Sequence, residues 1–282
     1  MDSPPPSWQP TIIRRFIKAL STATATVIVE TDKGEGYLKA MGNPEGPHVL
    51  ACEWVGTQLA RRLGLLTFDF ALIYVTTDDE IPFTRSGKAQ PGPAFITRKE
   101  RGSSWGGGKK ELKRLANLPD LTRLVLFDTW TRNCDRHPTD STKRRPNRDN
   151  VFFSREDAPS KRFLLKAMDH GCCFTWGRDL TPRIAQLAYV KEEGCYGLFP
   201  EFWPYLDRDI LRSAVQTLRA IAREEVRQIV ASIPREWDVP TSARDALIEL
   251  ICRRAVFVSD RIEGWIWPQR EFDFTPPEGE AL

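Results

Sequence analysis

Residues 127–174 contain three short polar blocks, each bordered by apolar residues: NCDRHP at 133–138, NRDNVFF at 147–153 and FLLKAMDHGCCF at 163–174. Apolar side chains at near-helical spacing over residues 120–132 predict a buried helix that ends just before Asp135. The apolar runs at 151–153 and 163–168 predict the two strands of a hairpin. That hairpin would bring Asn150, at the start of one strand, close to Asp169, at the end of the other.

Asp135, Asn150 and Asp169 are the residue types that phosphoryl transfer from a magnesium-bound nucleotide requires. The reaction needs one carboxylate beside the acceptor hydroxyl and oxygen ligands that hold Mg²⁺ against the phosphates. Asp135 is the candidate for the first role, and Asn150 and Asp169 are the candidates for the second. Each residue alone is more often a cap or a turn former, so the prediction depends on their ordered combination. Arg136 and His137 are expected to brace the loop that carries Asp135.

Lys39 and Glu53 form a second candidate group near the N-terminus. Lys39 lies in the strand-like segment GYLKA (36–40), and an ammonium group in an apolar strand requires an anion. Residues 48–63 predict a helix that carries Glu53, and a strand lysine with a helix glutamate is the ion pair that positions nucleotide phosphates in kinases. The alternative is a surface pair that never meets, since such pairs contribute only about 0–1 kcal/mol.

Other segments complete the expected nucleotide site. The small-residue turn that includes Ser21 and Thr22 could bring backbone amides to phosphate oxygens, although a plain loop is an equal alternative. Strands are predicted at 24–29, 68–75 and 94–97, with Ile96 and Thr97 as candidates for backbone hydrogen bonds to adenine. Residues 12–20 predict a short amphipathic helix, and residues 207–221, 224–233 and 241–265 predict longer helices.

The segment ERGSSWGGGKK (100–110) predicts a flexible linker, because three consecutive glycines leave the backbone mobile. It does not match a phosphate-binding loop, since its lysines are not followed by Ser or Thr. Ser103 and Ser104 in this segment are candidates for self-phosphorylation, which mass spectrometry after incubation with ATP would test.

The blocks NCDRHP, NVFF and AMDHG resemble the catalytic and metal-binding segments of the HipA-like kinases, especially their short single-domain branch. They resemble more distantly those of type II phosphatidylinositol 4-kinases. The resemblance implies an α+β, two-lobed protein-kinase-like fold, with a small β-rich N-lobe at 12–98 and a mostly helical C-lobe at 99–270. A flexible arm (1–11) and a tail (271–282) would flank the lobes. ATP and Mg²⁺ are the implied cofactors and a protein serine or threonine the implied acceptor, as in relatives that act as toxins with an antitoxin or regulatory partner.

One departure from the family pattern concerns the second metal ligand. An insert, TDSTKRRPNRD (139–149), separates Asp135 from Asn150, and Asp140 occupies the position where relatives usually have the asparagine. Asn150 is the preferred ligand because it precedes a predicted strand, and Asp140 is the substitute. A run of like charges in an insert is usually a solvated loop, and the alternative is a docking patch for an acidic substrate or RNA. The basic residues of the insert are Lys143, Arg144, Arg145 and Arg148.

Two other functions stay open at this stage. A small-molecule or lipid kinase is one, because this fold does not fix the substrate. A catalytically silent nucleotide-binding module is the other, and the displaced Asn150 is its best support. Retention of Lys39, Asp135 and Asp169 argues against it.

The composition is that of an ordinary globular protein, with 282 residues, 41% hydrophobic and 28% charged. The net charge of +3 argues against nucleic-acid binding outside the insert. No apolar stretch approaches the roughly 20 residues of a membrane helix, and the N-terminus lacks a signal-peptide pattern, which predicts a cytoplasmic protein. The cysteines show no paired spacing, which predicts reduced thiols and argues against zinc binding by Cys134, His137, His170 and Cys172.

Overall fold

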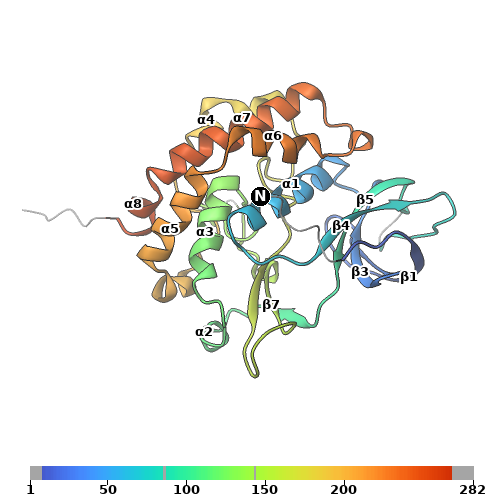
Figure 1. Ribbon diagram of the computed structural model, residues 1–282, viewed down its shortest axis with the longest axis horizontal. Coiled ribbons are helices and arrows are strands. Elements are labelled where there is room, and N and C mark those ends of the chain that lie inside the picture. The colour runs from blue at the N-terminus through green and yellow to red at the C-terminus, as the bar shows by residue number, and fades with distance from the viewer. Residues whose placement is uncertain (1–7, 85–86, 143, 269–282) are drawn as a thin grey trace, which may run out of the picture.

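The computed structural model describes residues 8–84, 87–142 and 144–268, and it has a sheet-rich N-terminal part and a helical C-terminal part (Figure 1). The N-terminal part is an antiparallel sheet in the order β1-β2-β3-β5-β4, and helix α1 (His48–Arg62) follows β3. This arrangement confirms the predicted α+β architecture. The strands are β1 (Ile13–Ala19), β2 (Val27–Thr31), β3 (Gly34–Lys39), β4 (Phe70–Val75) and β5 (Gly92–Arg98).

Strand β1 replaces the helix predicted over residues 12–20, so that prediction is wrong. β1 pairs antiparallel with β2, and its register shifts twice, between Ile13 and Arg15 and between Phe16 and Lys18. Each such irregularity adds a residue and changes which face the following side chains occupy. The apolar residues of a doubly shifted strand therefore repeat at a spacing that imitates a helix.

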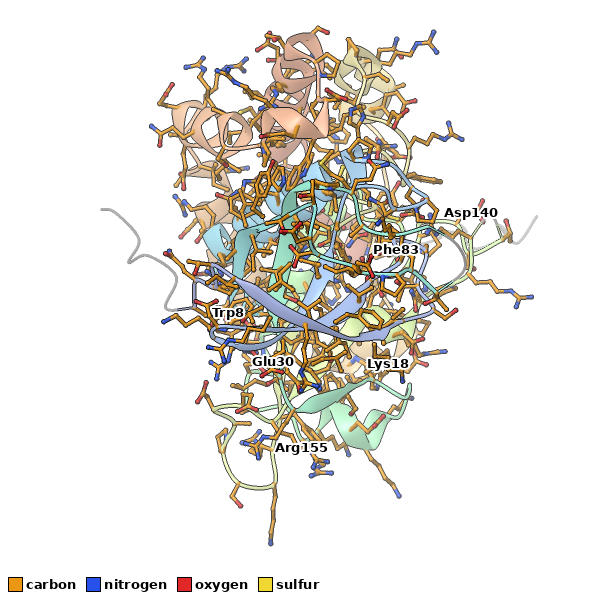
Figure 2. The ribbon with its side chains drawn as sticks, turned by 90° about the vertical axis from the view of Figure 1, so that its right-hand side faces the viewer. Trp8, Lys18, Glu30, Phe83, Asp140 and Arg155 are labelled. Atoms are coloured by element: carbon orange, nitrogen blue, oxygen red, sulfur yellow. The ribbon has the colours of Figure 1, made fainter. Side chains whose placement is uncertain are left out.

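The chain packs on this sheet from Trp8 onward. Trp8 is buried, and its indole nitrogen donates a hydrogen bond to the carbonyl of Lys33 at 2.8 Å (Figure 2). The flexible arm predicted over residues 1–11 is therefore wrong for its last residues. Residues 1–7 and the predicted tail at 271–282 lie outside the described residues.

The C-terminal part confirms the predicted hairpin and the long helices. Val151 pairs with Ala167, so the hairpin places Asn150 and Met168 at the same end of two neighbouring strands. Within the described ranges, no helix is long and apolar enough to cross a membrane. The elements are β6 (Gly102–Ser104), α2 (Lys109–Leu112), α3 (Asp120–Thr131), η1 (Arg148–Asn150), β7 (Val151–Ser154), β8 (Leu164–Ala167), η2 (Pro182–Ala185), α4 (Leu187–Val190), η3 (Pro200–Tyr205), α5 (Arg208–Arg219), α6 (Arg223–Ala231), η4 (Arg235–Trp237), α7 (Thr241–Ser259) and α8 (Ile262–Ile266).

The segment predicted as a flexible linker contains a strand and a buried tryptophan. Gly102–Ser104 form strand β6, which pairs with β7. Trp105 follows and is fully buried, with its ring 5.2 Å from the rings of both Phe199 and Phe202. Burial of one large aromatic ring anchors the chain, so the linker prediction is wrong for residues 102–105.

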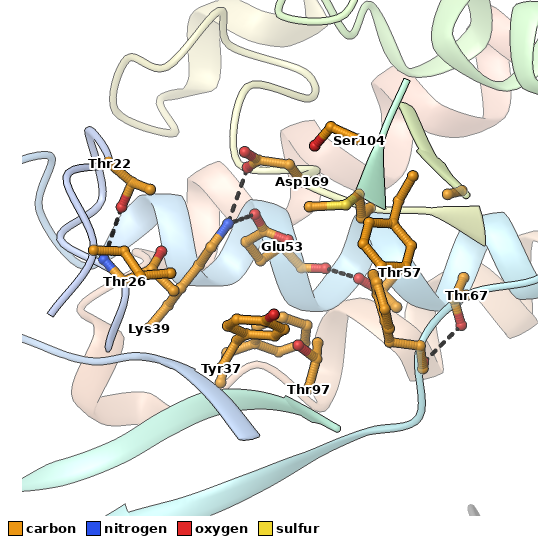
Figure 3. Close-up of a pocket in the computed structure, with 16 residues that line it drawn as sticks. Thr22, Thr26, Tyr37, Lys39, Glu53, Thr57, Thr67, Thr97, Ser104 and Asp169 are labelled. Carbon is orange, nitrogen blue, oxygen red and sulfur yellow. Dashed lines mark hydrogen bonds and ion pairs between the residues drawn. The ribbon is translucent and has the colours of Figure 1, made fainter. Parts of the chain in front are cut away.

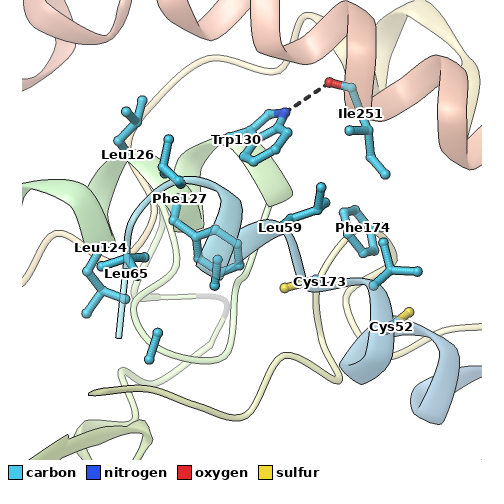
Figure 4. Packing of buried hydrophobic residues seen from close by; sticks show 14 of the residues in the cluster. Cys52, Leu59, Leu65, Leu124, Leu126, Phe127, Trp130, Cys173, Phe174 and Ile251 are labelled. Carbon is cyan, nitrogen blue, oxygen red and sulfur yellow. Dashed lines mark hydrogen bonds between the residues drawn. The ribbon is translucent and has the colours of Figure 1, made fainter. Parts of the chain in front are cut away.

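The largest hydrophobic cluster joins the two parts of the molecule. Leu59 of α1, Phe127 and Trp130 of α3, and Ile251 of α7 all belong to it (Figure 4). The Trp130 indole nitrogen also donates to the carbonyl of Ile251 at 2.9 Å. Helix α1 lies between the sheet and the helices in Figure 1, so its polar side chains are held by a core that both parts share. A second cluster, on the sheet, includes Trp8, Leu38 and Ile96.

Candidate active site

Lys39 lies at the end of β3 and contacts acidic side chains from two other elements (Figure 3). Its ammonium group forms an ion pair with Glu53 of α1 and a second one, at 2.9 Å, with Oδ1 of Asp169. The side chains of Lys39 and Glu53 are only 12% and 2% exposed. The two residues therefore meet in the interior, and they are not the separate surface charges of the alternative interpretation.

Charge pairing controls ionisation in this group. Burial alone would lower the pKa of Lys39, but the carboxylates of Asp169 and Glu53 raise it above its ordinary value. Burial alone would raise the pKa of Asp169, but the Lys39 ammonium, together with Glu53 and His170, outweighs that effect and lowers it. Lys39 is therefore cationic and Asp169 anionic at neutral pH.

The loop that carries Asp169 packs tightly on α1. Asp169 has a left-handed backbone, with φ at 58°, a conformation that is uncommon for residues other than glycine. The next residues come close to the helix: a Cβ at Gly171 would lie 2.6 Å from Val49, and one at Gly56 would lie 2.6 Å from His170. The Gly171 amide also donates to Glu53 Oε1 at 3.1 Å. The same carboxylate thus positions both Lys39 and the Asp169 loop.

Asp135 lies just past α3, as predicted, and its carboxylate is held from two sides. Asn150 Nδ2 donates to Asp135 Oδ2 at 2.6 Å, and the Arg144 guanidinium forms an ion pair with Oδ1. Asp140 instead accepts hydrogen bonds from Thr142, at 3.0 Å from its amide, and lies at the edge of the molecule in Figure 2. The geometry thus brings Asn150 to Asp135.

A buried ion pair connects the three loops of the site. Arg136 and Asp128 have no exposed side-chain area, and Arg136 Nη1 lies 2.5 Å from Asp128 Oδ1. Arg136 also donates to the carbonyl of Asn150 at 3.0 Å and to that of Met168 at 2.6 Å. One guanidinium therefore fixes the loop of Asp135 to the residues on either side of the hairpin end. This is the bracing role expected of Arg136.

A mostly apolar cleft begins beside Lys39 and Asp169. Phe68 and Phe152, with ring centroids 4.9 Å apart, form part of its wall. No local pattern predicted this wall, because Phe68 and Phe152 come from distant segments. Other described residues that line the cleft include Leu20, Thr22, Thr26, Tyr37, Phe95, Thr97, Ser104 and Met168.

The predicted nucleotide-contacting residues are only partly found at this cleft. Thr22 lines it from the β1–β2 turn, and its hydroxyl accepts a hydrogen bond from the Thr26 amide at 2.9 Å. Ser21 belongs to the same turn but lies outside the set of described lining residues. Thr97 lines the cleft, whereas the side chain of Ile96 is fully buried in the cluster on the sheet. Both residues pair with β3 and β4, so the backbone role predicted for them is wrong: their strand has neighbours on both sides.

Sequence reasoning missed Arg144. The insert was expected to be a solvated basic loop, but Arg144 turns inward to Asp135. Arg148 pairs with Glu201 at 2.8 Å and lies over the ring of Trp105. The docking patch is therefore not supported at these two positions, and Lys143 lies outside the described residues. The position of the insert could have indicated this contact, because a segment that joins the loops of Asp135 and Asn150 must pass close to both.

Comparison with known proteins identifies the family. The HipA-like kinase family model matches residues 11–256. No curated protein matches this chain. The proinflammatory kinase CtkA of Helicobacter pylori has a similar structure, with 13% sequence identity and a TM-score of 0.54, covering 93% of this chain and 98% of CtkA. A Golgi casein kinase with Mn/ADP bound is 11% identical with a TM-score of 0.48, covering 89% of this chain and 74% of that one. The similarity to CtkA shows a protein-kinase-like fold, and the family match over most of the chain shows that this protein belongs to the HipA-like kinases and is an ATP-dependent kinase.

Proposed function

We propose that this kinase transfers the γ-phosphate of ATP, bound with Mg²⁺, to a serine or threonine hydroxyl of a protein. The observation that carries the proposal is that two sets of charged side chains meet at one site, one around Arg136 and one around Lys39. Arg136 ties the Asp135 loop to the carbonyls of Asn150 and Met168, and Asp169, the next residue, pairs with Lys39. Phosphoryl transfer depends mainly on such positioning and electrostatic stabilisation.

Lys39 is the proposed ligand of the nucleotide phosphates. Its ammonium group is already desolvated and aimed by Glu53, so phosphate oxygens would replace Asp169 as its second partner. Thr22 lines the same cleft from the turn between strands β1 and β2. The apolar wall that includes Phe68 and Phe152 suits the base, because nucleotide pockets combine apolar walls with few polar groups.

Asp169 and Asn150 are the proposed metal ligands. Asn150 donates to Asp135 through Nδ2, which leaves its Oδ1 as an acceptor. A carboxylate and an amide oxygen fit Mg²⁺, which is usually held by one or two protein ligands together with substrate phosphates. When bound there, Mg²⁺ would neutralise the charge of the β- and γ-phosphates. Release of Asp169 from Lys39 would then free both residues at once for their separate ligands.

Asp135 is the proposed group that orients the acceptor hydroxyl and accepts its proton. Its side chain is 19% exposed, so the carboxylate remains accessible while Asn150 and Arg144 fix its orientation. A carboxylate held from both sides loses little freedom when it receives a hydrogen bond from the acceptor. This preorganisation is the main contribution that a protein can make to such a step.

The protein acceptor rests on the family, in which it is the expected substrate class. Transfer of labelled γ-phosphate from ATP into cell lysate, followed by phosphoamino-acid analysis, tests it. We expect phosphoserine or phosphothreonine with wild type and Mg²⁺, and no label with EDTA or with Asp135→Ala. Label that enters only lipid or small molecules would refute the protein acceptor.

The family also suggests a growth-arresting toxin with an antitoxin or another regulatory partner. Induced expression in cells tests this role. We expect growth arrest with wild type and normal growth with Asp135→Ala at equal protein levels. Arrest by both proteins would show that phosphoryl transfer is not its cause.

A further inference from the structure

Two cysteines of the site face the same guanidinium. Arg144 Nη1 donates to Cys134 Sγ at 3.4 Å, and Arg144 Nη2 lies 3.6 Å from Cys172 Sγ. The two terminal nitrogens of one guanidinium thus contact both sulfurs. Cys134 directly precedes Asp135, and Cys172 follows Asp169 by three residues. The pair therefore bridges the loop of the proposed base and the loop of the proposed metal ligand.

The surroundings of these cysteines differ from those of the other cysteines in the described part of the chain, where all six are free thiols. Cys52 and Cys173 are fully buried in the hydrophobic cluster between α1 and α3 (Figure 4). Cys172 is partly exposed, so a small oxidant can reach it, whereas Cys134 is buried. The pKa of Cys134 is lowered, by its interaction with Cys172 and by the Arg144 cation, whereas the pKa of Cys172 is raised by its interaction with Cys134 and by burial. The thiolate, which is the reactive form of cysteine, is therefore favoured at Cys134.

We propose that Cys134 and Cys172 form an oxidation site for hydroperoxides, and that the resulting disulfide blocks phosphoryl transfer. The site itself is independent of the proposed function, whereas the blocking effect rests on it. Regulation of this kind would let an oxidant stop the kinase without any change in nucleotide concentration.

The reaction is balanced with hydrogen peroxide as the oxidant. One thiolate attacks a peroxide oxygen and the O–O bond breaks, which gives a sulfenic acid and a hydroxide that leaves as water after protonation. The second thiolate attacks the sulfenic sulfur, the S–O bond breaks, and a second water leaves. Two thiols and one peroxide thus give one disulfide and two waters. The two sulfurs are oxidised and the peroxide oxygens are reduced.

The disulfide would disturb the geometry of the site. A bonded sulfur pair is about 2.0 Å apart, closer than two thiols that are not bonded. Closing that distance pulls the residue before Asp135 toward the loop after Asp169 and removes both sulfurs as acceptors for Arg144. Since a shift of about 1 Å in a catalytic group can cost about a hundredfold in rate, we expect about that loss of transfer.

Peptide mapping of the full chain tests the site. Wild type, Cys134→Ser, Cys172→Ser and the control Cys195→Ser are treated with hydrogen peroxide, alkylated and digested. We expect wild type and Cys195→Ser to lose the mass of two hydrogens and to yield a peptide linked between 134 and 172, which dithiothreitol separates. Neither of the other variants should yield it. Absence of this link in wild type, or a link to another cysteine in its place, would overturn the proposal.

Activity measured on the same samples tests the block. We expect phosphoryl transfer by oxidised wild type to fall about a hundredfold and to return with dithiothreitol, while Cys172→Ser stays active in peroxide. Linked but fully active protein would overturn the blocking effect. If the reduced protein transfers no phosphate, the proposed function fails instead. The peptide map still decides whether the disulfide between Cys134 and Cys172 forms.

Discussion

The buried Asp128–Arg136 pair provides a stability prediction whose magnitude follows from the structure. Both side chains are completely buried, so removal of either partner leaves an uncompensated charge in the interior. Such losses are typically about 3–5 kcal/mol. Asp128→Leu should therefore lower the free energy of unfolding by about that amount. In a domain of this size each kcal/mol lowers the Tm by about 2–4 °C.

Arg136→Met should cost more than Asp128→Leu. Arg136 also donates to the carbonyls of Asn150 and Met168, and each buried carbonyl left without a donor costs about 1–3 kcal/mol. The double variant should be no less stable than Arg136→Met alone, because no charge then remains unpaired. The two effects are thus expected to be strongly non-additive.

Urea unfolding of the four proteins measures these free energies. The nine tryptophans provide the fluorescence signal, and several of them, such as Trp130, are buried in the core. A loss of less than about 1 kcal/mol in Asp128→Leu, or a double variant whose loss equals the sum of the single losses, would refute the reasoning. Either result would mean that the pair is hydrated or that another group compensates it.

Three further predictions concern the site. Lys39→Met should reduce phosphoryl transfer by about 10²–10³-fold, whereas Lys99→Met, which removes an exposed pair with Glu35, should leave it unchanged. Initial rates at several ATP concentrations measure both effects. Equal losses in the two variants would contradict the prediction. Asn150→Ala should raise the Mg²⁺ concentration needed for half-maximal transfer, and Asp140→Ala should not; the reverse order would assign the ligand to Asp140. Burial holds the pKa of His170 well below its ordinary 6.5. The unfolded chain therefore takes up a proton that the folded chain excludes, and stability should fall by up to about 1.4 kcal/mol per pH unit below pH 6.5. Urea midpoints at about pH 7.5 and 5.5 should show a smaller decrease in His170→Asn, and equal decreases would count against this explanation.

Local pattern was enough to predict the elements that carry the site. The apolar run after Asn150 and the one before Asp169 determine a hairpin, and a hairpin necessarily brings its ends together. Helix α1 was likewise predictable from its periodicity, and Glu53 faces inward on it beside Lys39. The roles of these residues in catalysis stay predictions.

Features that depend on long-range pairing could not be predicted. Strand β1 imitates a helix because its register shifts are set by β2, and β6 exists only because β7 lies beside it. Ile96 was misassigned for the same reason, since only the tertiary structure shows neighbours on both sides of β5. The direction of Arg144 depends on how the insert folds back over Asp135, and no local spacing encodes that.

The most direct test of the central claim is transfer of labelled γ-phosphate from ATP with Mg²⁺ by wild type, Asp135→Asn, Asp169→Asn and Asp149→Asn. Asp149 is an exposed aspartate one residue before Asn150 and serves as the matched control. Far-ultraviolet circular dichroism would verify that each variant is folded. We expect transfer by wild type and Asp149→Asn and its loss in the other two proteins. Undiminished transfer by Asp135→Asn and Asp169→Asn would show that the phosphoryl-transfer site lies elsewhere in the molecule.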